Sequence, residues 1–384
     1  MNREVYLDNS ATTRPFDDIL EEVGQTVGNS YGNPSSLHNK GLDSEKILKD
    51  ARSKVANSLG VNSGEIFFTS GGTESNNIAI LGAVRANEKR LGTIITSMIE
   101  HSSVLGVFRY LEKQGHKVKY LPVDKDGIIS LEILEKYIQT DKVTLVSIMH
   151  VNNEVGAVQP LEELIRLKRR YEFILHVDAV QSYCKLPLQN ICKDINLISV
   201  SGHKINAFKG IGVLYIKKGT RLEPVFHGGG QENYIKPGTE NVPGVWSLGR
   251  AVDINLSGKY GHFSKVRDLK NYFILRVMEE VQGAALNGTM DKYKSAPHIA
   301  NISFEGIPGE VMLHALEERG IYVSTGSACS SRKRELSHVL ISMGIDRELI
   351  KSSVRFSFSV NNNKDEVDYC LEAIKENVKL LAKE

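Results

Sequence analysis

The chain has 384 residues, of which 41% are hydrophobic and 24% charged, enough to bury a large apolar core without disulfides or metal. Its 48 basic and 46 acidic residues leave a formal net charge of +2, and no long block of one sign favours direct nucleic-acid binding. No apolar run approaches the roughly 18 residues of a membrane span, and Glu4 and Asp8 stand where a signal peptide would be apolar, so we expect a soluble, cytoplasmic protein without a membrane partner.

Short β-branched runs alternate with helical stretches between Glu65 and Tyr215. This alternation is typical of a parallel sheet covered by crossover helices. The clearest predicted helix spans 161–171, with Pro160 at its first turn, acidic residues near its start and basic residues near its end. The pattern predicts a large α/β domain over 21–255. Its expected strands are 66–68, 93–95, 118–120, 144–148, 173–177, 197–200 and 212–216.

The pattern changes after residue 255. Helices are expected at 264–281, 310–318 and 365–381, and short strands at 298–304 and 354–358. These elements predict a smaller C-terminal α+β domain over 256–384. Residues 1–20 are expected to form an N-terminal arm associated with that small domain.

The four cysteines contain no Cys-x-x-Cys pair, so we predict neither a disulfide framework nor a resident metal site. Cys184, Cys192 and Cys370 have apolar neighbours and are expected to be structural. Cys329 differs, because it lies in the small, polar segment 324–331. The basic run 332–334 beside it favours the thiolate, which is the reactive form of cysteine.

Polar residues follow several of the predicted strands, where ligands of open α/β sheets bind. The segment 69–77 has the glycines and helix start of an anion cradle, although an ordinary strand-to-helix turn fits it equally well. His101 fits a helix cap, a buried histidine or a flat surface for a planar ligand. Asp178 ends an apolar strand, where a carboxylate needs a cation or a strong donor. Lys204 follows another strand, although a lysine is ordinarily a surface residue.

One cofactor, pyridoxal 5'-phosphate (PLP), accounts for all of these residues together. Lys204 would bind its aldehyde covalently, and Asp178 would pair with the pyridine nitrogen. His101 would lie against the ring face, and Gln181 would bond the ring hydroxyl. The phosphate would be held by backbone N–H groups near Gly72 and by the side chains of Thr73, Ser201 and His203.

The chain resembles the NifS/IscS cysteine desulfurases, which are class V aminotransferase-like, fold-type I PLP enzymes. The resemblance is nearly end to end and rests on the joint order of many motifs. It implies a PLP-dependent transferase fold with a large, mainly parallel seven-stranded sheet. The matching segments are 6–13, 32–38, 69–77, 100–104, 149–160, 176–182, 199–204, 228–232, 237–241 and 324–331.

The resemblance implies that sulfur is removed from L-cysteine to give L-alanine and a persulfide on Cys329, with Lys204 and His101 as further catalytic residues. Asn153 matches a residue that orients cofactor and substrate. Arg355 matches the group that holds the substrate carboxylate. Its alternation with apolar residues on a predicted strand also points its guanidinium into a cleft, where either a bidentate grip on a carboxylate or a plain ion pair fits. Thr239 matches a phosphate ligand given to the other subunit of a homodimer. The family passes sulfur to iron–sulfur scaffold proteins or tRNA thiolation enzymes.

Other interpretations stay open at this point. A selenocysteine lyase, an enzyme of cysteine-sulfinate chemistry or an aminotransferase would share the fold and cofactor. A non-catalytic assembly partner would use Cys329 as a transient iron–sulfur ligand. The chain also departs from the family at Ala207-Phe208, at Lys236, where arginine is common, and at Cys184, where glycine is usual.

Overall fold

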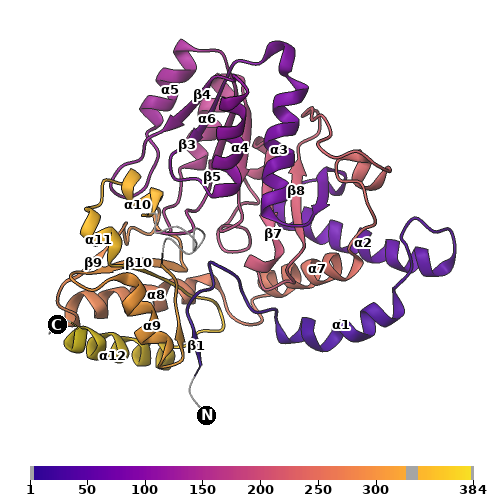
Figure 1. Ribbon diagram of the computed structural model, residues 1–384. Helices are drawn as coiled ribbons and strands as arrows, with labels where there is room; N and C mark the ends of the chain where they lie inside the picture. Colours follow the sequence, from indigo (N-terminus) through magenta and orange to yellow (C-terminus); the bar gives the residue numbers. More distant parts are fainter. Residues whose placement is uncertain (1–3, 326–335, 382–384) are drawn as a thin grey trace.

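A computed structural model describes residues 4–325 and 336–381 of the protein (Figure 1). Its strands are β1 (Val5–Tyr6), β2 (Ile66–Thr69), β3 (Thr93–Ser97), β4 (Val118–Leu121), β5 (Val143–Met149), β6 (Ile174–Asp178), β7 (Leu197–Ser201), β8 (Gly212–Ile216), β9 (Ala284–Leu286), β10 (Ile299–Phe304), β11 (Ile321–Tyr322) and β12 (Ser353–Ser357). Its α-helices are α1 (Asp17–Asn29), α2 (Asn39–Leu59), α3 (Gly72–Ala86), α4 (Ser102–Lys113), α5 (Leu131–Thr140), α6 (Leu161–Arg170), α7 (Val242–Ser257), α8 (Phe263–Glu280), α9 (Gly309–Glu317), α10 (His338–Ser342), α11 (Arg347–Lys351) and α12 (Lys364–Leu381).

A seven-stranded sheet in the order β2-β8-β7-β6-β5-β3-β4 forms the centre of the fold. Only β8 runs antiparallel to its neighbours, so the other six strands end at the same edge. All seven predicted strands are present, and the predicted α/β fold with a mainly parallel sheet is confirmed. The residues that end β2, β6 and β7, namely Thr69, Asp178 and Ser201, therefore meet at one edge.

Helices cover both faces of this sheet, as its almost entirely buried strands require. On one face α2, α5, α6 and α7 pack over residues such as Val146, Val177 and Val200. On the other face α3 and α4 pack over Ile94 and Leu145. The predicted capping of α6 is also present, with Pro160 at its N-terminus and basic residues in its last turn.

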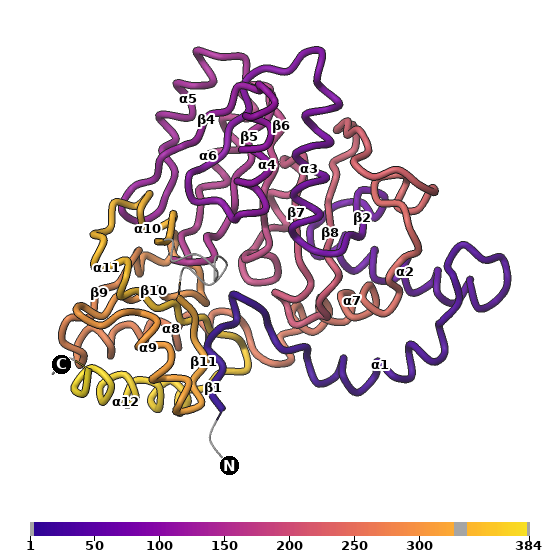
Figure 2. Tube along the Cα trace, in the orientation of Figure 1, coloured from indigo at the N-terminus to yellow at the C-terminus, as the bar shows by residue number. Residues whose placement is uncertain are grey.

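A second sheet, in the order β12-β10-β9, is antiparallel and packs with α8, α9 and α12 around a separate apolar cluster. The N-terminal strand β1 pairs with β11 (Figure 2), and Val5 and Leu7 lie in the same cluster. These contacts support the small α+β part and its association with the N-terminal arm. We propose the domain limits 21–255 and 256–384 on this basis.

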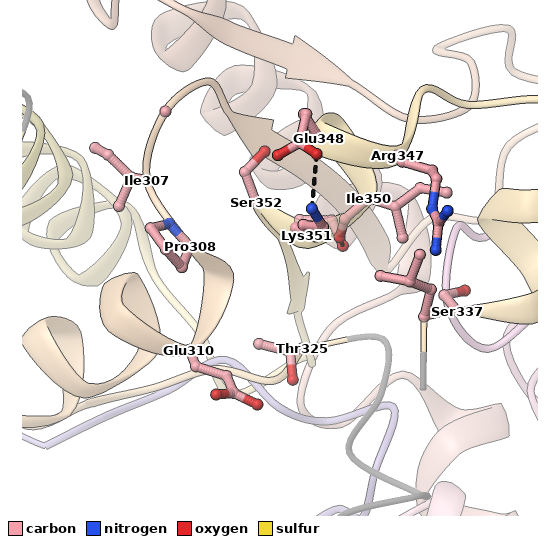
Figure 3. A pocket seen from close by; sticks show the side chains of 13 residues that line it. Ile307, Pro308, Glu310, Thr325, Ser337, Arg347, Glu348, Ile350, Lys351 and Ser352 are labelled. Carbon is pink, nitrogen blue, oxygen red and sulfur yellow. Dashed lines mark hydrogen bonds and ion pairs between the residues drawn. The ribbon is translucent and has the colours of Figure 1, made fainter. Parts of the chain in front are cut away.

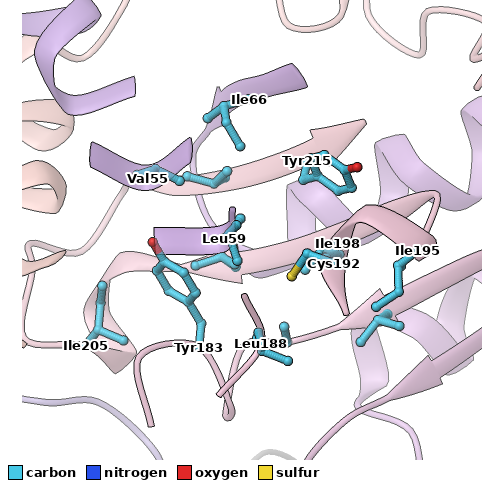
Figure 4. Packing of buried hydrophobic residues seen from close by; sticks show 14 of the residues in the cluster. Val55, Leu59, Ile66, Tyr183, Leu188, Cys192, Ile195, Ile198, Ile205 and Tyr215 are labelled. Atoms are coloured by element: carbon cyan, nitrogen blue, oxygen red, sulfur yellow. The ribbon is translucent and has the colours of Figure 1, made fainter. Parts of the chain in front are cut away.

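Two of the cysteines expected to be structural are fully buried. Cys192 packs beside Leu188 and Tyr215 in the main core (Figure 4), and Cys370 lies in the core of the C-terminal part. Cys184 is half-buried and has φ 60°, a conformation that glycine adopts more easily. This backbone conformation explains why glycine would suit position 184.

Candidate active site

A cavity of about 370 Å³ opens at the edge where the parallel strands end. Ten of the residues predicted for the site line this cavity. They are Gly72, Thr73, His101, Asn153, Asp178, Gln181, Ser201, His203, Lys204 and Arg355.

One end of the cavity has the features of an anion cradle. Helix α3 begins at Gly72, and the first N–H groups of a helix lack acceptors within it. A Cβ atom at Gly72 would come within 2.6 Å of Val180 Cγ2, so glycine lets the helix start lie close to the segment that follows β6. Thr73 and Ser201 add hydroxyl groups to the same lining.

His203 completes the cradle as a neutral ring. Its Nδ1 lies 3.1 Å from Thr12 Oγ1. Burial and then the charge of Lys204 lower the pKa of His203 to about 4. At neutral pH it therefore donates one hydrogen bond and adds no positive charge.

Asp178 is a buried carboxylate held by neutral donors. Its Oδ2 accepts from Asn76 Nδ2 at 2.7 Å, and its Oδ1 accepts from the Val180 N–H at 3.0 Å. Asn76 also donates to Ser103 Oγ at 2.8 Å, which ties α3 to the start of α4. Because no cation is among these partners, Asp178 is suited to a positively charged group in the cavity. Asn76 was not singled out in the sequence, although it lies within the segment 69–77.

His101 is the N-cap of α4, the first of its three predicted roles. Its Nδ1 accepts from the Ser103 N–H at 3.2 Å, so the neutral ring carries its proton on Nε2. Burial lowers the pKa of His101, with Asp178 opposing that effect. The ring also lines the cavity, where its Nε2 can exchange a proton with a ligand.

Lys204 and Gln181 both contact the N-terminal segment. Lys204 Nζ donates to the carbonyl oxygens of Ser10 at 2.5 Å and Ala11 at 2.6 Å. Gln181 Nε2 donates to the same Ser10 oxygen at 2.8 Å. The N-terminal arm thus forms one wall of the site, a contribution that the arm's sequence did not predict.

Arg355 both lines the cavity and forms the ion pair that was its alternative role. Its Nη2 lies 2.8 Å from Asp8 Oδ1, and its Nη1 donates to the Asn153 carbonyl at 3.0 Å. The Nε atom is buried and has no hydrogen-bond partner among the described residues. Arg355 is only 5% exposed, so its guanidinium is shielded from bulk solvent. Asp8, its carboxylate partner, was not predicted.

Of the predicted residues that the structure describes, one does not line this cavity. Thr239 is exposed and lines another cavity of about 590 Å³ together with Glu74 and Lys236, and its role in a partner's site stays a prediction. Cys329 lies outside the described residues. Thr325 and Ser337, on either side of that gap, line a further cavity of about 720 Å³ in the C-terminal part (Figure 3). There Lys351 pairs with Glu348 at 2.6 Å.

The comparisons with known proteins agree with this geometry. Residues 5–370 match the family model described as aminotransferase class-V. The chain is 40% identical to the cysteine desulfurase IscS of Dictyoglomus turgidum, over 98% of this chain and 94% of the relative. It is also 40% identical to the IscS of Methanosarcina thermophila, over 99% and 93%.

Solved structures give the same result. A structure described as a NifS-like protein superposes with a TM-score of 0.91 at 39% identity, covering 99% of this chain and all of that one. One described as SspA in complex with cysteine superposes with a TM-score of 0.80 at 32% identity, covering 92% and 98%. The chain belongs to the class-V aminotransferase family. Within that family it is a PLP-dependent enzyme of the IscS and NifS kind.

The residues in the cavity fit PLP as this class-V aminotransferase would bind it. The helix start at Gly72, with its two hydroxyls, suits a phosphate, and Asp178 suits a protonated pyridine nitrogen. Lys204 supplies the amine in the same cavity. Within residues 4–325 and 336–381 no group of three or more His, Cys, Asp or Glu side chains is placed to share a metal ion. No helix in these ranges is long and apolar enough to cross a membrane.

Glu100 is a second buried carboxyl beside the site that the sequence did not predict. It is 0% exposed, and its Oε1 accepts from Ser97 Oγ at 2.6 Å and from the Met149 N–H at 3.0 Å. Its Oε2 has no partner in the described part of the chain. Burial, reinforced by the charge of Asp178, raises the pKa of Glu100 to about 8. The folded protein therefore holds a proton on Glu100 at neutral pH.

Because Glu100 is protonated in the folded protein, we expect the difference in free energy of unfolding between the wild type and Glu100→Gln to depend on pH. The pKa is about 8 in the folded state and 4.5 for an ordinary glutamate, so the free energy of unfolding contributed by Glu100 falls as the pH rises from 4.5 to 8. Glutamine cannot ionise. The free energy of unfolding of the Glu100→Gln protein, relative to that of the wild type, should therefore increase by about 1.4 kcal/mol per pH unit in that window. Urea unfolding of both proteins between pH 5 and 8 measures this. A constant difference would contradict the assignment.

Proposed function

We propose that this protein removes sulfur from L-cysteine and keeps it as a persulfide on Cys329. The substrate's carbon–sulfur bond breaks, and a sulfur–sulfur bond forms to Cys329 Sγ. The proton of the Cys329 thiol ends on the substrate Cβ, which gives L-alanine. Atoms and electrons balance without an external oxidant. A protein acceptor, either an iron–sulfur scaffold or a tRNA thiolation enzyme, then takes the sulfur.

One observation carries this proposal. Lys204, Asp178, His101 and Arg355 come from distant parts of the sequence and line a single cavity. The identity of 40% over nearly the full length to proteins named cysteine desulfurase supports cysteine as the substrate. The similar SspA structure is described as containing cysteine.

Each side chain has a distinct task in this reaction. PLP, when bound, supplies an electron sink that acidifies the substrate Cα proton and accepts electrons during carbon–sulfur cleavage. Asp178 holds a proton on the pyridine nitrogen, and Lys204 Nζ binds the cofactor and later carries the Cα proton. His101, neutral with its proton on Nε2, exchanges a proton with the substrate. Arg355, whose side chain lines the cavity, binds the substrate carboxylate.

Replacing Arg355 with lysine tests the substrate-binding role. Lysine keeps the charge but loses the planar fork that contacts Asp8 and Asn153. We expect KM for L-cysteine to rise by about 10²-fold, with a smaller change in kcat. Steady-state kinetics measure KM, and the cofactor absorbance of the same preparation distinguishes weaker substrate binding from a loss of cofactor. An unchanged KM would exclude Arg355 as the carboxylate ligand.

Product analysis tests the reaction itself. The holoenzyme with L-cysteine and excess dithiothreitol should release alanine and sulfide in equal amounts. Pyruvate with ammonia would indicate elimination instead, and mercaptopyruvate would indicate transamination. Intact-mass analysis without reductant should show one added sulfur on Cys329.

We further propose a cytoplasmic homodimer in which Thr239 reaches the partner's cofactor site. The exposed position of Thr239, outside the cavity of its own chain, supports this arrangement. Sedimentation equilibrium gives the mass of the assembly. A monomer that retains full activity would exclude the shared site.

A further inference from the structure

Two buried basic side chains lie behind Gln181 and do not line the cavity. Lys185 follows Gln181 by four residues, and its Nζ is 3.5 Å from Gln181 Oε1 and 3.4 Å from His298 Nε2. His298 precedes β10 in the C-terminal part, and its Nε2 is 3.2 Å from the same Gln181 oxygen. The two side chains are 7% and 0% exposed, and the rings of Phe263 and His298 are nearly perpendicular, with their centroids 6.2 Å apart.

These contacts determine which end of the Gln181 amide faces the cavity. The oxygen Oε1 lies within hydrogen-bond distance of Lys185 Nζ and His298 Nε2. The nitrogen Nε2 gives one hydrogen to the Ser10 carbonyl. An amide nitrogen carries two hydrogens, and the second is the group that Gln181 can offer to a ligand in the cavity. A flipped amide would place an acceptor there instead.

The pair acts through hydrogen bonding and not as an ion pair. Lys185 faces Lys204 and Cys184, and burial lowers the pKa of Lys185 to about 7. His298 faces Lys185, Lys270, Lys204 and Arg267, and burial lowers its pKa well below the usual value. No carboxylate pairs with either side chain in the described ranges. If the His298 proton is on Nε2 it donates to Gln181 directly, and if it is on Nδ1 then Lys185 donates to Gln181. The Gln181 oxygen is the acceptor in both cases.

We propose that Lys185 and His298 are positioning residues that hold the Gln181 amide with its N–H toward the cavity, where it donates to the anionic ring oxygen of the bound cofactor. This inference rests on the proposed function. It assigns a role to a buried amine and imidazole that the desulfuration steps do not use. It also links the C-terminal part, through His298, to the cofactor end of the large sheet.

The test is a double-mutant cycle read by the cofactor's own absorbance. Lys185→Met replaces a buried amine of lowered pKa with an apolar side chain of similar length, which a core tolerates. Without Lys185, the Gln181 amide is no longer held with its N–H toward the anionic ring oxygen of the cofactor. Loss of that hydrogen bond should raise the pH midpoint of the cofactor's absorbance change by about half a unit to one unit. Gln181→Leu should cause a similar rise. Lys185→Gln, which keeps a donor, should restore most of the wild-type midpoint.

The decisive comparison is Lys185→Met in the Gln181→Leu background. If Lys185 acts through Gln181, it adds no further shift there. An equal shift in both backgrounds would show a direct charge effect and overturn the proposal, as would no shift in either. The same double-mutant cycle can be measured with His298→Leu in place of Lys185→Met. It decides the question if the Lys185→Met protein does not fold. A wild-type protein without a cofactor band would refute the proposed function itself, whereas a normal band unaffected by these variants would refute only this inference.

Discussion

Replacing Lys204 with alanine should reduce alanine and sulfide formation from L-cysteine by at least about 10³-fold. The reason is geometric, because Lys204 Nζ is an amine in the cavity that also holds Asp178 and the cradle at Gly72. Alanine removes both the covalent attachment point and the group that carries the Cα proton. Single-turnover assays with added PLP would measure the loss.

The purified Lys204→Ala protein should also contain a cofactor that gel filtration removes, since only non-covalent contacts would retain it. Far-UV circular dichroism should match the wild type, because alanine leaves the strand β7 before it unchanged. Lys193→Ala is a suitable control. Lys193 is exposed in the short 3₁₀ helix Cys192–Asp194 before β7 and does not line the cavity. Comparable activity in the Lys204 and Lys193 variants would contradict the role assigned to Lys204.

Replacing Cys329 with serine should have a comparably large effect on sulfide release, again at least about 10³-fold. A hydroxyl is a far weaker nucleophile toward sulfur than a thiolate. In contrast to the Lys204 variant, this protein should keep its bound cofactor and its absorbance. The measurement is sulfide release together with the cofactor spectrum on one sample.

Cys184→Ser provides the matched cysteine control. Burial raises the pKa of the Cys184 thiol to about 12, so Cys184 is protonated at neutral pH and unsuited to attack sulfur. The Cys184 variant should therefore retain sulfide release. If the Cys329→Ser variant also retained sulfide release, the persulfide would have to form on a residue other than Cys329.

The sheet and the main site residues could be predicted from the sequence. Strands buried on both faces appear as continuous apolar runs, and the polar residues after them, such as Asp178 and Ser201, meet because parallel strands end at one edge. The ranges of helices α8, α9 and α12 also agree with the predicted ranges to within a residue or so.

The partners of those residues could not be predicted in the same way. Asp8 meets Arg355 across 347 residues, and His298 meets Gln181 across 117, so only the tertiary fold shows these contacts. Glu100 lies next to His101 in the sequence, but its role depends on burial that a single sequence does not reveal. Arg355 illustrates the limit well, because it forms the predicted ion pair with Asp8 and also lines the cavity, where its contact with a carboxylate stays a prediction.

The account depends most directly on the covalent attachment of the cofactor to one lysine. Freshly purified protein treated with sodium borohydride, digested and mapped by mass spectrometry should carry a pyridoxyl phosphate group on Lys204. The Lys204→Ala protein should carry none. An unmodified Lys204 in protein that holds PLP, or a group on another lysine, would contradict the account.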